Sequence, residues 1–163
     1  MTRCYRIVRP AFAPEALSGE GARLYGGRWN PPGWRCVYTA GSRALAVLEM
    51  LCHLPAAART LEFRLIEIGL PNHLITPRAK VPPDWNQLPS SAGARAFGRH
   101  WLAAAQHAAL AVPSVLVPEE DIFLLNPLAP GFDRVRILGQ RRFALDERLA
   151  LTATPPLNPN LPR

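Results

Sequence analysis

The sequence predicts a single α+β domain. Two segments have a helical pattern, whereas several shorter apolar segments have the length and composition of strands. The helices do not alternate regularly with these strands, which favours segregated α and β elements. With 163 residues, of which 48% are hydrophobic, the chain is long enough to bury one core. We expect the domain to span residues 1–151 and the proline-rich residues 152–163 to form a flexible tail.

The chain begins with a strand and leads into a glycine turn. Residues 4–8 alternate well enough for a strand, and the prolines from Pro10 to Pro14 end it. Residues 18–24 (SGEGARL) are expected to be a loop. This loop leads to Gly26-Gly27, a pair that allows backbone conformations closed to other residues.

The next segment predicts a strand, a capped helix and a second strand. Residues 36–39 (CVYT) indicate a short strand. Ser42 follows Gly41 and is placed to cap a helix over about residues 43–54, which Pro55 ends. Residues 61–70 (LEFRLIEIGL) alternate apolar and charged side chains, which is typical of a half-buried strand.

The middle of the chain predicts a long connection followed by a helix. Residues 71–91 contain too many prolines for regular structure, so we expect a surface connection that could act as a lid. Residues 94–111 have a helical period, and residues 114–117 indicate an inner strand. The stripe expected to face the core consists of Phe97, Trp101, Ala105 and Ala108.

The last third predicts three strands. They are expected over residues 122–125, 133–138 and 142–145, and residues 146–149 close the domain. The sequence contains no internal repeat and no sign of a second domain.

Composition narrows the classes of function. No apolar run reaches the roughly 18 residues that a membrane span needs, and no apolar segment follows the charged N-terminus, so we expect neither membrane association nor a signal peptide. The cytoplasm is therefore the expected location. The net charge is +7, and all of the 19 basic residues except Lys80 are arginines. Arginine suits anionic ligands, but these arginines are spread along the chain, so direct nucleic-acid binding is the lesser alternative.

Cysteine and histidine usage predicts no metal site. Cys4, Cys36 and Cys52 are odd in number and show no CxxC spacing, which fits reduced thiols. The four histidines form no paired-ligand pattern. We expect no prosthetic group.

Glu49 is the sharpest candidate for chemistry. It lies in the apolar run from Ala44 to Leu54, where burying a carboxylate is costly unless something pairs with it or uses it. A solvent-facing helix position is the alternative interpretation. An anionic carboxylate in a dry pocket could stabilise positive charge that develops on a substrate.

The candidate partners of Glu49 come from separate segments. We expect Arg28 and Tyr38 to meet Glu49 in one pocket, with Gly27 letting a bulky ligand approach and Trp29 forming a wall. A surface arginine and a core aromatic residue are the alternatives for Arg28 and Tyr38. Ser114 could be a simple strand-end hydroxyl. The chain lacks the GxSxG, GxGxxG and Walker motifs.

Six segments carry a recognisable pattern: GARLYGGRWN (21–30), VYTAGSRALAVLEMLCH (37–53), GRHWL (98–102), VPSVLVP (112–118), LLNPLAP (124–130) and FALDERL (143–149). Together they resemble the RES domain, a toxin family of bacterial toxin–antitoxin pairs. The family's Arg, Tyr, Glu and Ser fall on Arg28, Tyr38, Glu49 and Ser114. Two positions depart from the family pattern. The family has an Asn before the LLNP motif, where this chain has DIF (121–123), and it has a His where this chain has Ala129.

The resemblance implies an ADP-ribosyltransferase-like fold with small central β-sheets flanked by a few helices. It implies NAD as a substrate whose nicotinamide–ribose bond is cleaved, with water, inorganic phosphate or a protein as the acceptor. Glu49, Arg28 and Tyr38 are then the catalytic residues, and Ser114, Gly27, Trp29 and Asn126 join Arg28 and Tyr38 in binding NAD. The implied partner is an Xre-type helix-turn-helix antitoxin, and a homodimer is an assembly that the sequence leaves open.

Overall fold

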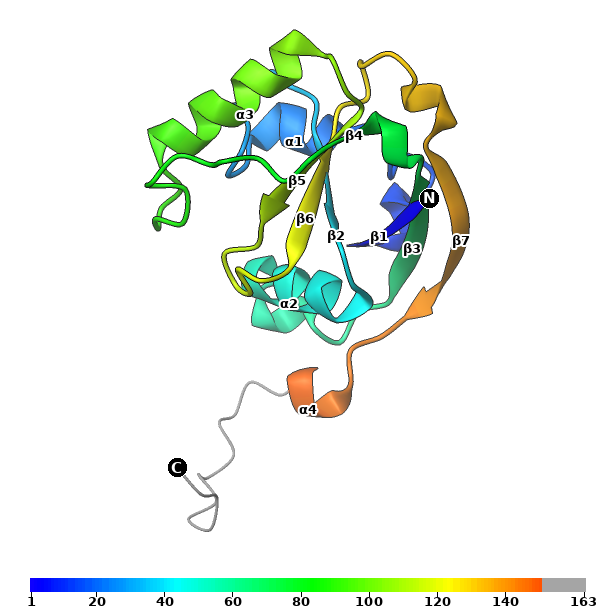
Figure 1. Cartoon of the computed structure of the whole chain (residues 1–163). Helices are drawn as coiled ribbons and strands as arrows, with labels where there is room; N and C mark the ends of the chain where they lie inside the picture. The colour runs from blue at the N-terminus through cyan, green and yellow to red at the C-terminus, as the bar shows by residue number, and fades with distance from the viewer. Residues whose placement is uncertain (151–163) are drawn as a thin grey trace.

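The computed structural model describes residues 1–150, so the tail predicted for residues 152–163 lies outside the described residues. Figure 1 shows the arrangement of the elements. The strands are β1 (Thr2–Val8), β2 (Val37–Ala40), β3 (Phe63–Leu70), β4 (Ile75–Thr76), β5 (Ala109–Pro113), β6 (Asp121–Leu125) and β7 (Arg136–Phe143). The α-helices are α1 (Glu20–Tyr25), α2 (Arg43–His53), α3 (Ala92–Ala104) and α4 (Glu147–Ala150). Short 3₁₀ turns are η1 (Pro10–Phe12), η2 (Ala56–Ala58), η3 (Asn72–Leu74) and η4 (Phe132–Arg134).

The strands form one curved sheet in the order β4-β5-β6-β2-β1-β3-β7. β4 and β5 pair in parallel, and every other neighbouring pair in this sheet is antiparallel. The sheet curls into a half-barrel, and α2 packs against β1 and β2 (Figure 1). The α+β class is confirmed, with all of the strands joined in a single sheet.

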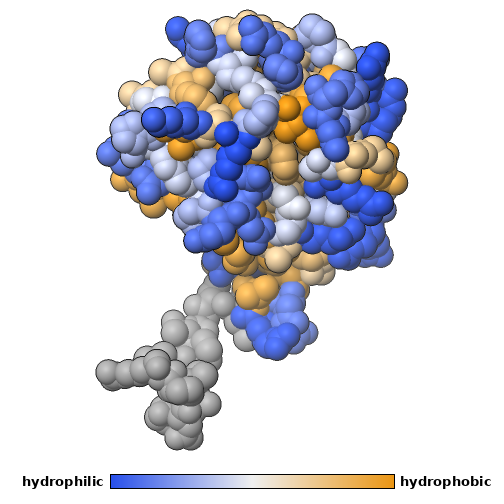
Figure 2. Space-filling model, viewed as in Figure 1, coloured by the Kyte–Doolittle hydropathy of each residue, from blue (hydrophilic) through white to orange (hydrophobic). Residues whose placement is uncertain are grey.

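Both faces of the central strands are buried. Cys4 belongs to one apolar cluster and its neighbour Tyr5 to the other, as do Leu125 and Leu124 on β6. Successive side chains of a strand point to opposite faces, so these two clusters cover the two sides of the sheet. Hydrophilic residues cover most of the face shown in Figure 2, with hydrophobic residues in smaller patches between them.

The helix α2 forms as predicted. Ser42 is extended at the N-cap, and its Oγ accepts a hydrogen bond from the Leu45 N–H. Leu45 and Ala46 are buried, whereas Leu48 and His53 are exposed. Glu49 lies between these two faces and is half-buried.

The loop predicted for residues 18–24 is wrong, because residues from Glu20 onward form α1. Gly19 adopts φ +67 before the helix, and the Ser18 Oγ accepts from the Glu20 N–H. The Arg23 guanidinium contacts the Glu20 carboxylate at i,i+3 and stabilises the short helix. The glycines in this stretch favoured a loop over a helix in the sequence analysis, because glycine has a low helix propensity.

The predicted helix over residues 94–111 is too long. α3 ends at Ala104, where Ala105 adopts φ +47 and its N–H bonds to the Trp101 carbonyl. Ala109 and Ala111 belong to β5, which is buried along its whole length. A buried strand and a buried helix have the same apolar run, so composition could not separate them. The strand predicted for residues 114–117 is also wrong, because β5 ends at Pro113.

The two strands predicted over residues 133–138 and 142–145 are one strand, β7, preceded by η4. Residues 139–141, which the prediction left between two strands, belong to β7. The register against β3 shifts between Glu67 and Ile68, where Glu67 faces Gly139 and Ile68 faces Ile137. The bulge absorbs Leu138, and the strand continues past it.

Candidate active site

A cavity of about 360 Å³ lies between β1, β2 and α2. Its volume is in the range of small-molecule pockets. Its apolar wall includes Tyr5, Ile7, Ala46, Met50, Leu54, Phe63 and Ile122. The lining residues whose side chains carry polar groups are Tyr5, Arg6, Arg9, Tyr38, Thr39, Glu49 and His53. Two of the three predicted catalytic residues, Tyr38 and Glu49, therefore share this cavity.

Glu49 is held in place from the turn after β5. The Ser114 hydroxyl donates to Glu49 Oε1 at 2.8 Å. Ser114 is 1% exposed, and its Oγ also accepts from the backbone N–H groups of Leu116 (3.1 Å) and Val117 (3.2 Å). A hydroxyl has one proton to donate, and these two N–H contacts leave Glu49 as its acceptor. Ser114 is not among the residues that line the cavity, so its contact with the site passes through Glu49.

Tyr38 is one of the residues that line the cavity, and its hydroxyl bonds to the loop of residues 29–30. Its Oη donates to Asn30 Oδ1 at 2.6 Å and accepts from the Trp29 N–H at 3.0 Å. Burial raises the pKa of Tyr38 well above its usual value, so the phenol stays neutral. Gly27 permits this arrangement, because a Cβ there would lie 2.5 Å from the Tyr38 Oη.

Asn30 is a structural residue that the sequence reasoning did not single out. Its side chain is fully buried, and Nδ2 donates to the carbonyls of Ala22, Pro31 and Trp34 at 2.9–3.1 Å. Asn30 therefore ties together the loop on which Arg28 and Trp29 lie. An Asn in a turn rich in Gly and Pro was the only available signal.

Arg28 is directed toward the proline-rich connection, and it is not among the cavity-lining residues. Its Nη1 donates to the carbonyls of Trp85 and Gln87, both at 2.8 Å. Its charge acts to lower the pKa of Tyr38 against the larger effect of burial. Its chain neighbour Trp29 donates its N–H to the Tyr38 hydroxyl. Arg28 thus flanks the site and does not form its wall.

Arg6 is a cavity residue that the sequence reasoning missed. It lies on β1, and burial lowers the pKa of its guanidinium. Its Nη1 makes a long contact of 3.5 Å with the Tyr38 carbonyl. Arg6 and Arg9 provide positive charge on the same wall, where no motif marked them. An arginine inside an alternating strand was the only hint.

Trp29 and Asn126 are buried in structural roles. Trp29 is 2% exposed and packs between Trp85 and Phe97, with ring centroids 6.4 Å and 5.8 Å away. Asn126 donates to the Leu102 carbonyl and accepts from the Leu128 N–H. It lines a different cavity of about 230 Å³. The cavity that contains Glu49 is not lined by Trp29, by Asn126 or by Gly27.

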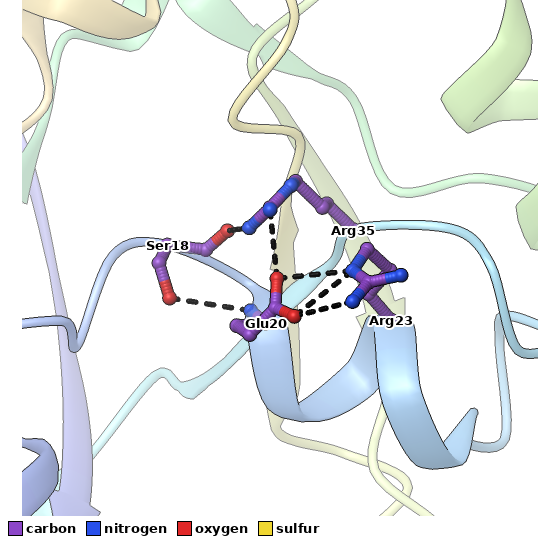
Figure 3. Close-up of polar contacts among 4 residues, drawn as sticks. All are labelled: Ser18, Glu20, Arg23 and Arg35. Carbon is purple, nitrogen blue, oxygen red and sulfur yellow. Dashed lines mark hydrogen bonds and ion pairs between the residues drawn. The ribbon is translucent and has the colours of Figure 1, made fainter.

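The second cavity lies beside a charged cluster on α1. Glu20 pairs with Arg23 at 2.6 Å and with Arg35 at 2.7 Å, and Arg35 also donates to the Ser18 carbonyl (Figure 3). These contacts lower the pKa of Glu20, chiefly through the hydrogen bonds from Arg23. The cluster fastens α1 to the loop before β2.

Three further features of residues 1–150 concern metal-ligand clusters, cysteine thiols and membrane-spanning helices. No group of three or more His, Cys, Asp or Glu among residues 1–150 could hold a metal ion. Burial raises the pKa of Cys4 and Cys36 to about 12, so both thiols stay protonated. Within the same range, no helix is long and apolar enough to cross a membrane.

These features define an α+β protein with a cavity in which a hydrogen-bonded carboxylate, a neutral tyrosine and an arginine meet. The chain belongs to the RES domain family, whose profile matches residues 3–146. The resemblance drawn from the motifs is therefore confirmed.

Several relatives match most of the chain. One is "Prs ADP-ribosylating toxin" of Sphingobium sp., 38% identical over 156 residues, which cover 91% of this chain and 96% of that protein. Another is "Toxin Res" of Photorhabdus laumondii, 36% identical over 148 residues, which cover 89% of this chain and 95% of that protein. A shorter match, 40% identical over 73 residues, links 44% of this chain to 38% of "NAD(+) phosphorylase MbcT" of Mycobacterium tuberculosis.

The fold also matches a solved structure. A chain in the crystal structure of the M. tuberculosis MbcT–MbcA toxin–antitoxin complex aligns with a TM-score of 0.66 and 23% identity. The alignment covers 88% of this chain and 84% of that chain. The two chains therefore share a fold, in agreement with the α+β class expected from the sequence.

Proposed function

We propose that this protein is the toxin of a bacterial toxin–antitoxin pair, and that it binds NAD and cleaves its nicotinamide–ribose bond. The observation that supports this most is the Glu49 carboxylate, which Ser114 holds beside a cavity shared with Tyr38 and Arg6. The name of the mycobacterial relative, NAD(+) phosphorylase, supports the same reaction. NAD is then a substrate, and no prosthetic group is proposed.

The reaction suits a fixed carboxylate. When the bond between the ribose carbon and the nicotinamide nitrogen breaks, its electron pair stays on the nitrogen and neutralises the pyridinium ring. The leaving group therefore needs no proton, and the positive charge passes to the ribose. Glu49 stabilises this oxocarbenium-like state and accepts a hydrogen bond from a ribose hydroxyl.

The other residues bind the substrate or hold Glu49. The Tyr38 ring stacks on nicotinamide, and Arg28 binds the phosphates. Ser114 keeps the carboxylate in position, and Gly27, Trp29 and Asn30 hold Tyr38 from behind. Arg6 and Arg9 add positive charge to the cavity wall, where an anionic acceptor such as inorganic phosphate could bind.

A second candidate function is the transfer of ADP-ribose to a protein. The name of the Sphingobium relative, which matches over most of both chains, favours it. Both functions share the bond cleavage and differ in the acceptor: phosphate or water in one case, a protein side chain in the other. The same cavity serves both.

An antitoxin is the proposed partner, because the matching solved structure is a toxin–antitoxin complex. We propose the Xre-type helix-turn-helix protein that the family resemblance implies. Co-expression of this chain with such a protein encoded by a neighbouring gene, followed by purification through a tag on one chain, tests the pairing. Recovery of the tagged chain alone would argue against it.

Mass spectrometry of the products from purified protein and NAD tests the activity. We expect nicotinamide release, with ADP-ribose 1-phosphate formed when phosphate is added and ADP-ribose when water is the acceptor. A labelled protein band from labelled NAD and lysate would favour the second candidate. Glu49→Gln is the matched control, expected to lose about 10²–10³-fold in kcat. Turnover by Glu49→Gln equal to that of the wild type would reject the role of Glu49.

A further inference from the structure

The Arg28 guanidinium is held on one side only. Nη1 donates to two carbonyls, those of Trp85 and Gln87, at 2.8 Å each. A guanidinium has five N–H donors in a planar fork, and Nη1 carries two of them. Within residues 1–150, Nε and Nη2 of Arg28 make no hydrogen bond or ion pair. The Nε/Nη2 edge is the one that can bind a phosphate in bidentate fashion.

The two carbonyls belong to a fixed segment of the proline-rich connection. The Trp85 ring stacks on Trp29 at an interplanar angle of 14°, and Trp29 is buried. The Trp85 N–H bonds to the Pro82 carbonyl, and the Gln87 N–H bonds to the Asp84 carbonyl. The segment therefore forms tight turns that its indole ring anchors to the core.

The same anchor reaches the cavity. The Trp29 N–H donates to the Tyr38 Oη, so the residue that carries the stack also holds the phenol. Trp29 is also the chain neighbour of Arg28. The Trp29–Trp85 stack therefore fixes both the backbone beside Arg28 and the carbonyls that the guanidinium contacts.

We propose that Trp85 is a positioning residue for the substrate's phosphates: it holds the carbonyls of residues 85 and 87 so that they orient Arg28 with its Nε/Nη2 edge free. This proposal rests on the NAD-binding function proposed above. The carbonyl dipoles satisfy one side of the guanidinium and leave its charge for an anion on the other side. The alternative is that the segment holds Arg28 away from the ligand. In that case, removal of the Trp85 ring would strengthen NAD binding, whereas the positioning role predicts that it weakens NAD binding.

Calorimetric titration of NAD and of nicotinamide riboside, which has no phosphate, tests the proposal. All variants carry Glu49→Gln so that NAD is not consumed. We expect Trp85→Ala to weaken NAD binding about tenfold or more, the scale of a lost charge-assisted hydrogen bond, and to leave riboside binding unchanged. The double variant Arg28→Ala/Trp85→Ala should bind NAD no more weakly than Arg28→Ala alone, because Trp85 acts through Arg28.

Three further variants complete the design. Trp85→Phe keeps a stacking ring and should restore most of the affinity. Trp85→Leu keeps apolar volume without a stack and replaces Trp85→Ala if that protein does not fold. Phe12→Ala removes an exposed aromatic ring from η1 and is the control for aromatic truncation.

The results separate this inference from the proposed function. Tighter NAD binding by Trp85→Ala, an equal loss for the riboside, or additive losses in the double variant would overturn the positioning role alone. Absence of any NAD binding by the Glu49→Gln protein would overturn the proposed function and this inference together.

Discussion

The Ser114 hydroxyl donates to Glu49 Oε1 at 2.8 Å, across 65 positions of the sequence. The contact joins α2 to the turn after β5, two elements that share no local sequence pattern. Because Ser114 is buried and also accepts two backbone N–H groups, its hydroxyl is fixed before any ligand arrives. The carboxylate that we propose for catalysis is therefore oriented by the fold itself.

Replacement of Ser114 by Ala should lower both activity and stability. The variant frees the Glu49 carboxylate and leaves the N–H groups of Leu116 and Val117 without their acceptor, which costs about 1–3 kcal/mol of the free energy of unfolding. Urea unfolding and the kcat for NAD measure the two effects. Ser114→Thr retains the hydroxyl and should recover kcat. Full kcat in Ser114→Ala, with only the stability reduced, would mean that Ser114 has no part in orienting Glu49.

Replacement of Tyr38 by Phe should separate the hydroxyl from the ring. The variant keeps the cavity wall but leaves the Trp29 N–H and the Asn30 Oδ1 unpaired, so we expect a loss of about 1–3 kcal/mol in unfolding free energy. The kcat/KM of the folded protein should be retained, whereas Tyr38→Ala should lose it. Loss of kcat/KM in a stable Tyr38→Phe protein would show that the hydroxyl itself acts on the substrate.

A methyl group at Gly27 should disturb the Tyr38 hydroxyl. The added Cβ would lie 2.5 Å from Oη, so Gly27→Ala should destabilise the protein by about 1–3 kcal/mol through overpacking. Gly21→Ala is the matched control, because nothing lies within 4 Å of a Cβ there and Gly21 is exposed on α1. It should be neutral or stabilising. Equal unfolding midpoints for the two variants in thermal scans would contradict the proposed crowding.

Acid should remove the contribution of Glu20 to stability. Its pKa is lowered in the folded protein, so its contribution is complete above the unfolded-state pKa and is lost as the pH falls through the folded-state pKa. The pKa of Asp146 is lowered in the same direction, to about 2, mainly by hydrogen bonds from Arg148. Urea unfolding of the wild type and of Glu20→Gln over acidic pH isolates the Glu20 part. The two curves should converge at low pH, and parallel curves would contradict this prediction.

The parts of the fold that the sequence predicted well have local causes. The α2 helix could be predicted because Gly41 and Ser42 form its start and Pro55 follows its end. The end of α3 could not, since Ala105 adopts a left-handed backbone that its residue type disfavours, and the alanines of β5 fit either a helix or a strand. In the folded protein, packing on both faces of the sheet favours a strand over a helix for the β5 segment.

The sequence predicted that Tyr38 and Glu49 lie at one cavity, but it did not predict the contacts that hold them. An acid in an apolar helix marked Glu49, and the RES motifs marked Arg28, Tyr38 and Ser114. The contacts of Arg28 with Trp85 and Gln87 span 57 and 59 positions, and no pattern in the sequence indicates them. Arg6 was missed for the same reason, since its role depends on which strands the fold places beside β1.

The amide of Asn30, bonded to three carbonyls, has a consequence for ligand recognition. The loop that backs Tyr38 is ordered when the chain folds, so its loss of conformational entropy does not weaken binding later. A ligand therefore meets a rigid wall here, and molecules that would require this wall to move are selected against by shape alone.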